Sequence, residues 1–138
     1  MLESVLIDSG PLIALFDASE KHHRSVRAFL KKHPYRYVST LAVITEVSHM
    51  LDFSTAVQRD FYEWVMCKGV IISDINQNDM PRLVELADKY ADLPMDFADG
   101  TLVITAEKTG IREIISLYKD FDVYRLPGRE WIRNIYKP

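Results

Sequence analysis

The sequence predicts an α/β protein in which a central parallel sheet of about four to five short strands lies between helices, a three-layer α/β/α fold. Short apolar runs of strand-forming residues alternate with longer segments whose apolar residues recur at helical spacing. This alternation is typical of a parallel sheet covered on both faces. The 138 residues are 48% hydrophobic and 27% charged, as expected for one apolar core. Because the chain contains no repeat, low-complexity tract or linker, we expect residues 1–138 to form a single domain.

The first predicted elements are a strand, a short helix and a longer helix. The strand is expected at 5–7, and a turn from Asp8 to Pro11 separates it from a short helix at 12–16. Between 19–33 the apolar residues recur at helical spacing among Lys, His and Arg. This pattern predicts an amphipathic helix with a solvated outer face.

The middle of the chain predicts two more strands and two capped helices. A second strand is expected at 35–39, and Thr40 is suited to cap the helix that follows. The buried face of that helix is expected to include Leu41, Ile44, Val47, Ser48 and Leu51. Ser54 can cap another helix, which is expected to end at Gly69. A third strand follows at 70–73.

The C-terminal half is predicted to begin and end with helices. Asn76 or Asn78 can cap the first of them. A second helix begins at Asp96 and runs to Gly110, a residue type that often follows the last helical turn. The remaining elements are expected to be two strands and a final amphipathic helix, at 114–116, 123–126 and 129–137.

Charge and composition exclude several classes of protein. The formal net charge is −3 at pH 7, so net charge does not favour non-specific binding to nucleic acid. Cys67 is the only cysteine, which excludes an intrachain disulfide and a cysteine-based zinc site, and we expect it to lie in the core. The apolar runs are shorter than the roughly 18 residues of a membrane span. The N-terminus also lacks a basic segment followed by the apolar core of a signal peptide. We therefore expect a cytoplasmic protein with no membrane partner.

Four acidic residues form the candidate site. Asp96 and Asp99 are three residues apart at a helix start, where such positions are neighbours about 5 to 6 Å apart. Asp8 follows the first strand, where open α/β sheets bind ligands. Glu46 stands among apolar residues, so we expect it to face a polar pocket. The alternative is that Asp8 and Asp96 only cap helices, with Asp99 completing a capping box.

Three segments together resemble the PIN-domain nucleases, and most closely the small VapC-type ribonuclease toxins. These segments are Val5-Leu6-Ile7-Asp8-Ser9, Thr45-Glu46, and Leu93-Pro94-Met95-Asp96-Phe97-Ala98-Asp99. The resemblance runs from end to end of the chain, and its last segment is the most specific.

The resemblance implies a metal-dependent endoribonuclease whose acids hold Mg²⁺ or Mn²⁺. The implied metal ligands and catalytic residues are Asp8, Glu46, Asp96 and Asp99, and the Ser9 hydroxyl is an expected support. These hard cations prefer carboxylate oxygens, and a water bound to them becomes acidic enough to attack a phosphodiester. The family further implies the toxin of a toxin–antitoxin pair, an antitoxin partner and a homodimer.

An RNA substrate would need positive charge near these acids. The C-terminal part offers three candidates for phosphate contact, Lys119, Arg125 and Arg129. Their alternative role is a solvated charged surface.

One position departs from the pattern of the family and leaves an alternative function open. The family commonly carries a further Asp just after the fourth strand, where this chain has Tyr118, and Asp120 could take its place. A protonated phenol is a poor ligand for Mg²⁺. The alternative is thus a PIN-like RNA-binding or protein-interaction module with weakened catalysis. Phosphotransfer through a nucleophilic Asp8 is disfavoured, because Gly10 stands where such enzymes have a second Asp, and no nucleotide-binding glycine motif occurs.

Overall fold

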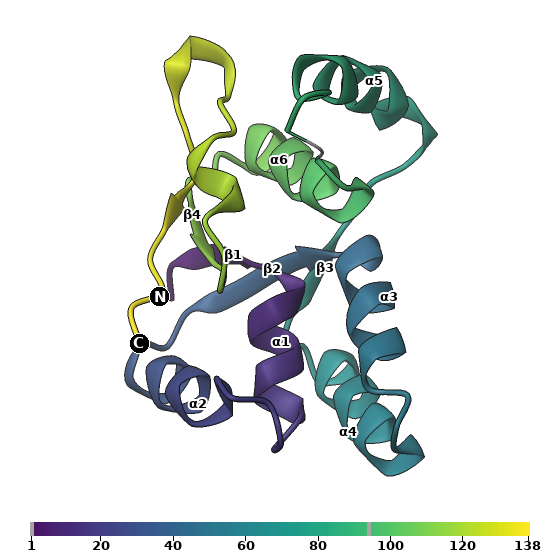
Figure 1. Ribbon diagram of the computed structural model, residues 1–138, viewed down its shortest axis with the longest axis vertical. Helices are drawn as coiled ribbons and strands as arrows, with labels where there is room; N and C mark the ends of the chain where they lie inside the picture. The colour runs from purple at the N-terminus through teal and green to yellow at the C-terminus, as the bar shows by residue number, and fades with distance from the viewer. Residues whose placement is uncertain (1, 94) are drawn as a thin grey trace.

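The computed structural model describes residues 2–93 and 95–138. Five strands form one parallel sheet in the order β3-β2-β1-β4-β5, and they are β1 (Ser4–Ile7), β2 (Arg36–Thr40), β3 (Ile71–Ser73), β4 (Glu113–Ile115) and β5 (Arg133–Asn134). The helices are α1 (Ser9–Phe16), α2 (His23–Lys32), α3 (Leu41–Met50), α4 (Thr55–Met66), α5 (Met80–Lys89) and α6 (Phe97–Thr109). Figure 1 shows α1, α2 and α4 on one side of the sheet and α5 and α6 on the other. The predicted three-layer α/β/α fold is confirmed.

The central strand β1 divides the sheet into two halves. Val5, Leu6 and Ile7 are fully buried, as expected for a strand covered by helices on both faces. On one side β1 pairs with β2, and on the other side Leu6 pairs with Ile114 of β4. The strand order therefore reverses direction between β1 and β4. In open parallel sheets such a switch point leaves a crevice at the carboxyl ends of the strands, where ligands bind.

Helix α6 is buried on nearly every side and fixes one wall of this crevice. Its residues from Ala98 to Ala106 are all buried. A Cβ atom on Gly100 would lie 2.5 Å from Leu83 Cδ1 of α5, so glycine permits the close approach of these two helices. On the sheet side the Thr101 and Thr40 hydroxyls lie 2.8 Å apart and share a hydrogen bond. This buried contact ties α6 to the end of β2.

The helix caps agree with the sequence predictions. The hydroxyl of Thr40 accepts a hydrogen bond from the first turn of α3, and Ser54 does the same for α4. Asn76 caps a single 3₁₀ turn that leads into α5. Gly110 ends α6 with a φ of 82°, in the left-handed region that glycine adopts without strain.

The end of α4 differs in detail from the prediction. Lys68, not Gly69, has the positive φ of 65°, and the Gly69 N–H donates to the Trp64 carbonyl to close the helix. Glycine is needed for another reason, since a Cβ at Gly69 would lie 2.1 Å from the Trp64 ring. Two burial predictions were also wrong: Leu41 is 63% exposed, and Cys67 is exposed just beyond α4.

The C-terminal elements differ most from the prediction. Residues 123–126 form no strand: Tyr124 and Leu126 are buried from an irregular segment, and the Leu126 N–H donates to the Glu130 carbonyl. The prediction of a helix at 129–137 was also wrong. Backbone N–H groups of this segment donate to β4 or the residue before it, as when the Ile135 N–H donates to the Ile114 carbonyl. Pairing with β4 thus overrides the helical pattern and adds β5 to the sheet.

Pro94, which belongs to the most specific sequence segment, lies outside the described residues. Within the described ranges, no helix has both the length and the apolar character required to cross a membrane.

Candidate active site

Asp8 lies at the junction of β1 and α1, at the switch point between β1 and β4. Its backbone N–H donates to the Ile115 carbonyl of β4 at 3.1 Å. One carboxylate oxygen accepts from the Ser9 N–H at 2.8 Å, and the other accepts from the Ser116 hydroxyl at 3.3 Å. Asp8 is therefore a helix cap, as its alternative interpretation held, and is also buried to 6% exposure at the switch point of the sheet.

Asp96 and Asp99 occupy the first turn of α6 but have different surroundings. Asp96 caps the helix, because its Oδ1 accepts from the Asp99 N–H at 2.8 Å, and it is exposed. The Asp99 side chain does not complete a capping box. It is 7% exposed, and its Oδ2 accepts from the Tyr124 hydroxyl at 3.0 Å. Capping therefore explains the position of Asp96 and leaves the burial of Asp99 unexplained.

Glu46 reaches the same region from α3. It is exposed overall, and where a polar pocket was expected it lines a surface depression of about 360 Å³. The lining of this depression combines Glu46 and Asp96 with an exposed aromatic ring and small side chains, and its members are Ala42, Thr45, Glu46, Asp96, Phe97 and Ala98. The structure thus brings the α3 and α6 acids to one depression.

Burial and repulsion from neighbouring carboxylates raise the pKa values of Asp8, Glu46 and Asp99. Burial, followed by the charges of Asp96 and Asp120, raises the pKa of Asp8 to about 6, although the Ser9 and Ser116 hydrogen bonds oppose this rise. Burial and the charges of Asp8 and Asp96 raise the pKa of Asp99 to about 7. The pKa of Glu46 is also raised, by partial burial and then by Asp96 and Asp8. Four acids from three parts of the chain therefore share one electrostatic field.

Three polar residues near the acids were missed or left open by the sequence analysis. Tyr124 binds Asp99, and burial together with that carboxylate raises the pKa of its phenol. Ser116 binds Asp8 from the end of β4. Asp120 contributes a repulsive charge to both Asp8 and Asp99, whereas Tyr118 is 60% exposed. Parallel strand ends meet at one edge, so Ser116 could have been found from its place after the fourth strand; Tyr124 had no such signal.

The donor set fits a hard divalent cation in its chemistry. Carboxylate oxygens are the ligands that Mg²⁺ and Mn²⁺ prefer, and the charges of neighbouring acids add to the burial that raises the pKa values of Asp8 and Asp99. As the side chains are placed, no three His, Cys, Asp or Glu residues in the described part of the chain converge closely enough to ligate one ion. The carboxylates are therefore close enough for their charges to interact but do not form a closed ligand cage.

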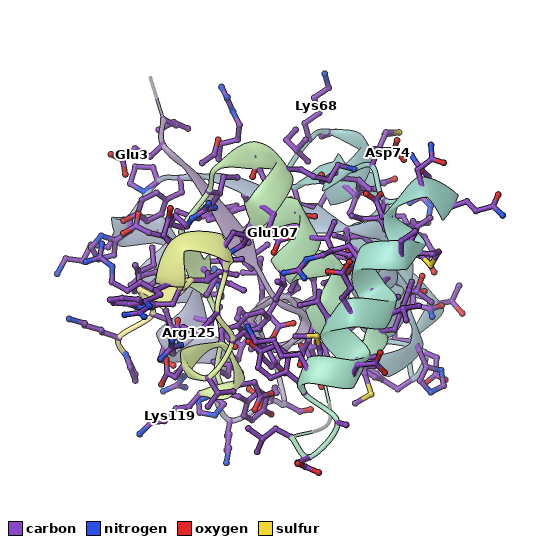
Figure 2. All side chains as sticks on the ribbon, turned by 90° about the horizontal axis from the view of Figure 1, so that it is seen from above. Glu3, Lys68, Asp74, Glu107, Lys119 and Arg125 are labelled. Carbon is purple, nitrogen blue, oxygen red and sulfur yellow. The ribbon has the colours of Figure 1, made fainter. Side chains whose placement is uncertain are left out.

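The remaining predicted residues lie around this crevice or on the C-terminal segment. The Ser9 N–H, rather than its hydroxyl, contacts Asp8, so hydroxyl support stays a prediction. Figure 2 shows Lys119 and Arg125 on the same side of the molecule. Arg125 lies 5.7 Å from the centroid of the Trp131 ring and donates to nearby carbonyl groups. Arg129 has a positive φ of 64° in the turn that follows.

Comparisons with known proteins agree with this architecture. A family model for the PIN domain matches residues 5–127. Among solved structures, the chain is similar to VapC20 of Mycobacterium tuberculosis, described as a sarcin-ricin loop cleaving toxin. The TM-score is 0.77 at 15% identity, over 86% of this chain and 92% of VapC20, a likeness that shows a common fold. A search of the curated proteins gives no match.

Proposed function

Because this chain belongs to the PIN domain family, we propose that it is a metal-dependent endoribonuclease that hydrolyses RNA phosphodiester bonds. One observation supports the proposal: acids from the β1–α1 junction, from α3 and from the start of α6 lie near enough for their charges to interact, and burial together with this repulsion raises the pKa values of Asp8, Glu46 and Asp99. Holding like charges together is unfavourable unless a cation offsets them. Residues 1–138 are proposed to form one domain around this site.

In the proposed site the four acids share one task, and their neighbours position them. Asp8, Glu46, Asp96 and Asp99 would hold one or two Mg²⁺ or Mn²⁺ ions, and Ser9 would support Asp8. When bound, such ions make a water molecule more acidic and neutralise charge on the phosphoryl oxygens. Ser116 and the Ser9 N–H hold the Asp8 carboxylate in place, and Tyr124 holds that of Asp99. Tyr124 is therefore a positioning residue, because it acts through Asp99.

The proposed ribonuclease function also implies partners for this protein. RNA phosphates would contact Lys119, Arg125 and Arg129 of the C-terminal segment. The fold similarity to a ribonuclease toxin supports the role of a cytoplasmic toxin that forms a homodimer and is restrained by a small antitoxin protein.

The first experiment is cleavage of a panel of structured and single-stranded RNAs in Mn²⁺ by the wild-type protein, with an EDTA control. We expect cleavage to require the metal and to vanish in Asp96→Asn. Asp92→Asn is the matched control, because Asp92 is also exposed and stands four residues before Asp96, outside the depression. Cleavage that persists unchanged in Asp96→Asn would refute the assignment of this site.

The second candidate function is an RNA-binding or protein-interaction module with weakened catalysis. The exposed Tyr118, at the position of an expected acid, favours it. RNA binding without cleavage by wild-type protein, followed by metal-dependent cleavage in Tyr118→Asp, would support this candidate over the first.

A further inference from the structure

Positive charge is concentrated in one segment of this acidic chain. Residues 21–45 contain no Asp or Glu, although they carry six of the 17 Lys and Arg residues, namely Lys21, Arg24, Arg27, Lys31, Lys32 and Arg36. The whole chain has a net charge of −3. Since the acids gather elsewhere, including the candidate active site, this segment forms a separate positive region.

Three of these cations line one groove on the layer of helices that contains α1, α2 and α4. Arg24, Arg27 and Lys31 are spaced at i, i+3 and i+7 and so share one face of α2, and all three are exposed. The groove has a volume of about 540 Å³. Apolar and aromatic side chains complete its lining, and they are Leu15, Ala28, Leu30, Tyr37 and Trp64.

These cations have no acidic partner in the described ranges 2–93 and 95–138, since no carboxylate lies within 4.0 Å of any of them. A different groove of about 680 Å³, at the amino ends of β1 and β4, provides a contrast. Its two arginines are paired, Arg112 with Glu130 and Arg133 with Glu113. The α2 groove thus offers charge that an external anion can meet without breaking an ion pair.

We propose that the α2 groove binds the phosphate backbone of single-stranded RNA, as a contact surface separate from the catalytic carboxylates. Guanidinium and ammonium groups neutralise phosphates, and Tyr37 and Trp64 in the lining offer aromatic surface to a base or a ribose. The choice of RNA rests on the proposed function. The groove is within reach of the site, because α1 joins them: Leu15 is six residues beyond Ser9, about 9 Å along a helix.

The test measures binding without cleavage. The parent protein is the full chain with Asp96→Asn. Its binding to a labelled single-stranded RNA is followed by fluorescence anisotropy in EDTA over a range of salt concentrations. A variant of this parent that also carries Arg24→Gln, Arg27→Gln and Lys31→Gln should bind the RNA at least tenfold more weakly. Each lost phosphate contact on a single strand lowers the salt slope by about 0.7, so the slope should fall by about 2.

A matched triple variant, Lys68→Gln with Lys89→Gln and Lys137→Gln, removes the same charge at exposed positions outside the groove. It should change affinity and slope little. Equal losses in the two triple variants, or no loss in the groove variant, would overturn the proposal, as would the absence of RNA binding by the Asp96→Asn parent. Thermal denaturation checks that the variants are folded.

A second readout places the ligand at the groove. Trp64 and Trp131 are the two tryptophans, so Trp131→Phe leaves Trp64 as the single reporter, and RNA should change its emission. Unchanged emission at saturating RNA would overturn the proposal. A poly-glutamate peptide that displaces RNA at equal charge concentration would also overturn it and would identify an acidic protein as the ligand. Because these measurements need no metal, they are independent of whether the carboxylates cut RNA.

Discussion

Replacing Asp99 by Asn should stabilise the metal-free protein while it impairs the enzyme. Asp99 is nearly buried among like charges, and its Oδ2 accepts a hydrogen bond from Tyr124. An asparagine carbonyl can accept the same hydrogen bond without carrying charge. The substitution therefore removes electrostatic repulsion with little change in packing, and it removes one proposed metal ligand.

The size of the effect follows from the pKa. Burial and the charges of Asp8 and Asp96 raise the pKa of Asp99 from 3.8 to about 7, and each unit corresponds to about 1.4 kcal/mol. The stabilisation by Asp99→Asn therefore has an upper limit of about 4 kcal/mol. Because Asp96 is exposed, solvent screens its charge, and we expect a stabilisation of about 1 to 2 kcal/mol. Folded wild-type protein binds more protons than the unfolded chain between pH 4 and 7, so its stability falls as pH rises through that interval.

The assay is urea unfolding in EDTA at pH 4 and pH 8. At pH 8 Asp99→Asn should exceed wild type by about 1 to 2 kcal/mol in free energy of unfolding. The difference should shrink as the pH falls and largely disappear near pH 4, where the unfolded chain also binds the proton. Asp92→Asn serves as the exposed control and should show no such pH dependence. Adding Mn²⁺ should stabilise wild type more than the variant. A variant that is less stable than wild type at pH 8, or equally shifted at both pH values, would refute the reasoning.

Three further predictions concern the surroundings of the site and the core. Tyr124→Phe removes the donor that lowers the pKa of Asp99, so RNA cleavage in Mn²⁺ should fall about tenfold, and the pH–rate profile should move to higher pH; an unchanged profile would argue against positioning. Asp120→Asn should reduce metal-dependent cleavage more than Tyr118→Phe, because the Asp120 carboxylate lies near enough to act on the charges of Asp8 and Asp99 and supplies the oxygen ligands that Mg²⁺ prefers, whereas a protonated phenol does not; the reverse order in steady-state kinetics would contradict this. Gly69→Ala should lower the free energy of unfolding by about 1 to 3 kcal/mol, since its Cβ would overlap the Trp64 ring; urea unfolding followed by tryptophan emission would detect a neutral result.

The parts of the fold that sequence predicted well are those set by local chemistry. Thr40, Ser54 and Asp96 each begin a helix with a side-chain cap, and β1 is a short apolar run that ends at Asp8. The alternation of such strands and helices was sufficient to predict the parallel sheet and its three layers. The strand β5 was not predictable from its own two residues, because hydrogen bonds to β4 alone define it.

The candidate site divides in the same way. Asp8 and Asp96 could be found because strand ends and helix starts are visible in sequence, whereas the partners of the acids depend on how distant segments pack. Tyr124 lies in an irregular segment 25 residues beyond Asp99, and nothing in its local pattern indicates burial against a carboxylate. The exposure of Glu46 and Leu41 likewise depends on how α3 is rotated against its neighbours, which helical periodicity leaves open.

The hydrogen bond between Asp8 and Ser116 joins residues that are 108 positions apart, and this separation has a consequence for synthesis of the chain. Strand β1 leaves the ribosome early, but one of its two neighbours, β4, is made only near the end. Contacts of such long range close late in folding, after more local helices have formed. A nascent chain that stops before β4 lacks Ser116, Asp120 and Tyr124 together. The acids therefore acquire their full surroundings only when synthesis is almost complete, and a truncated product should be inactive although it contains all four predicted ligands.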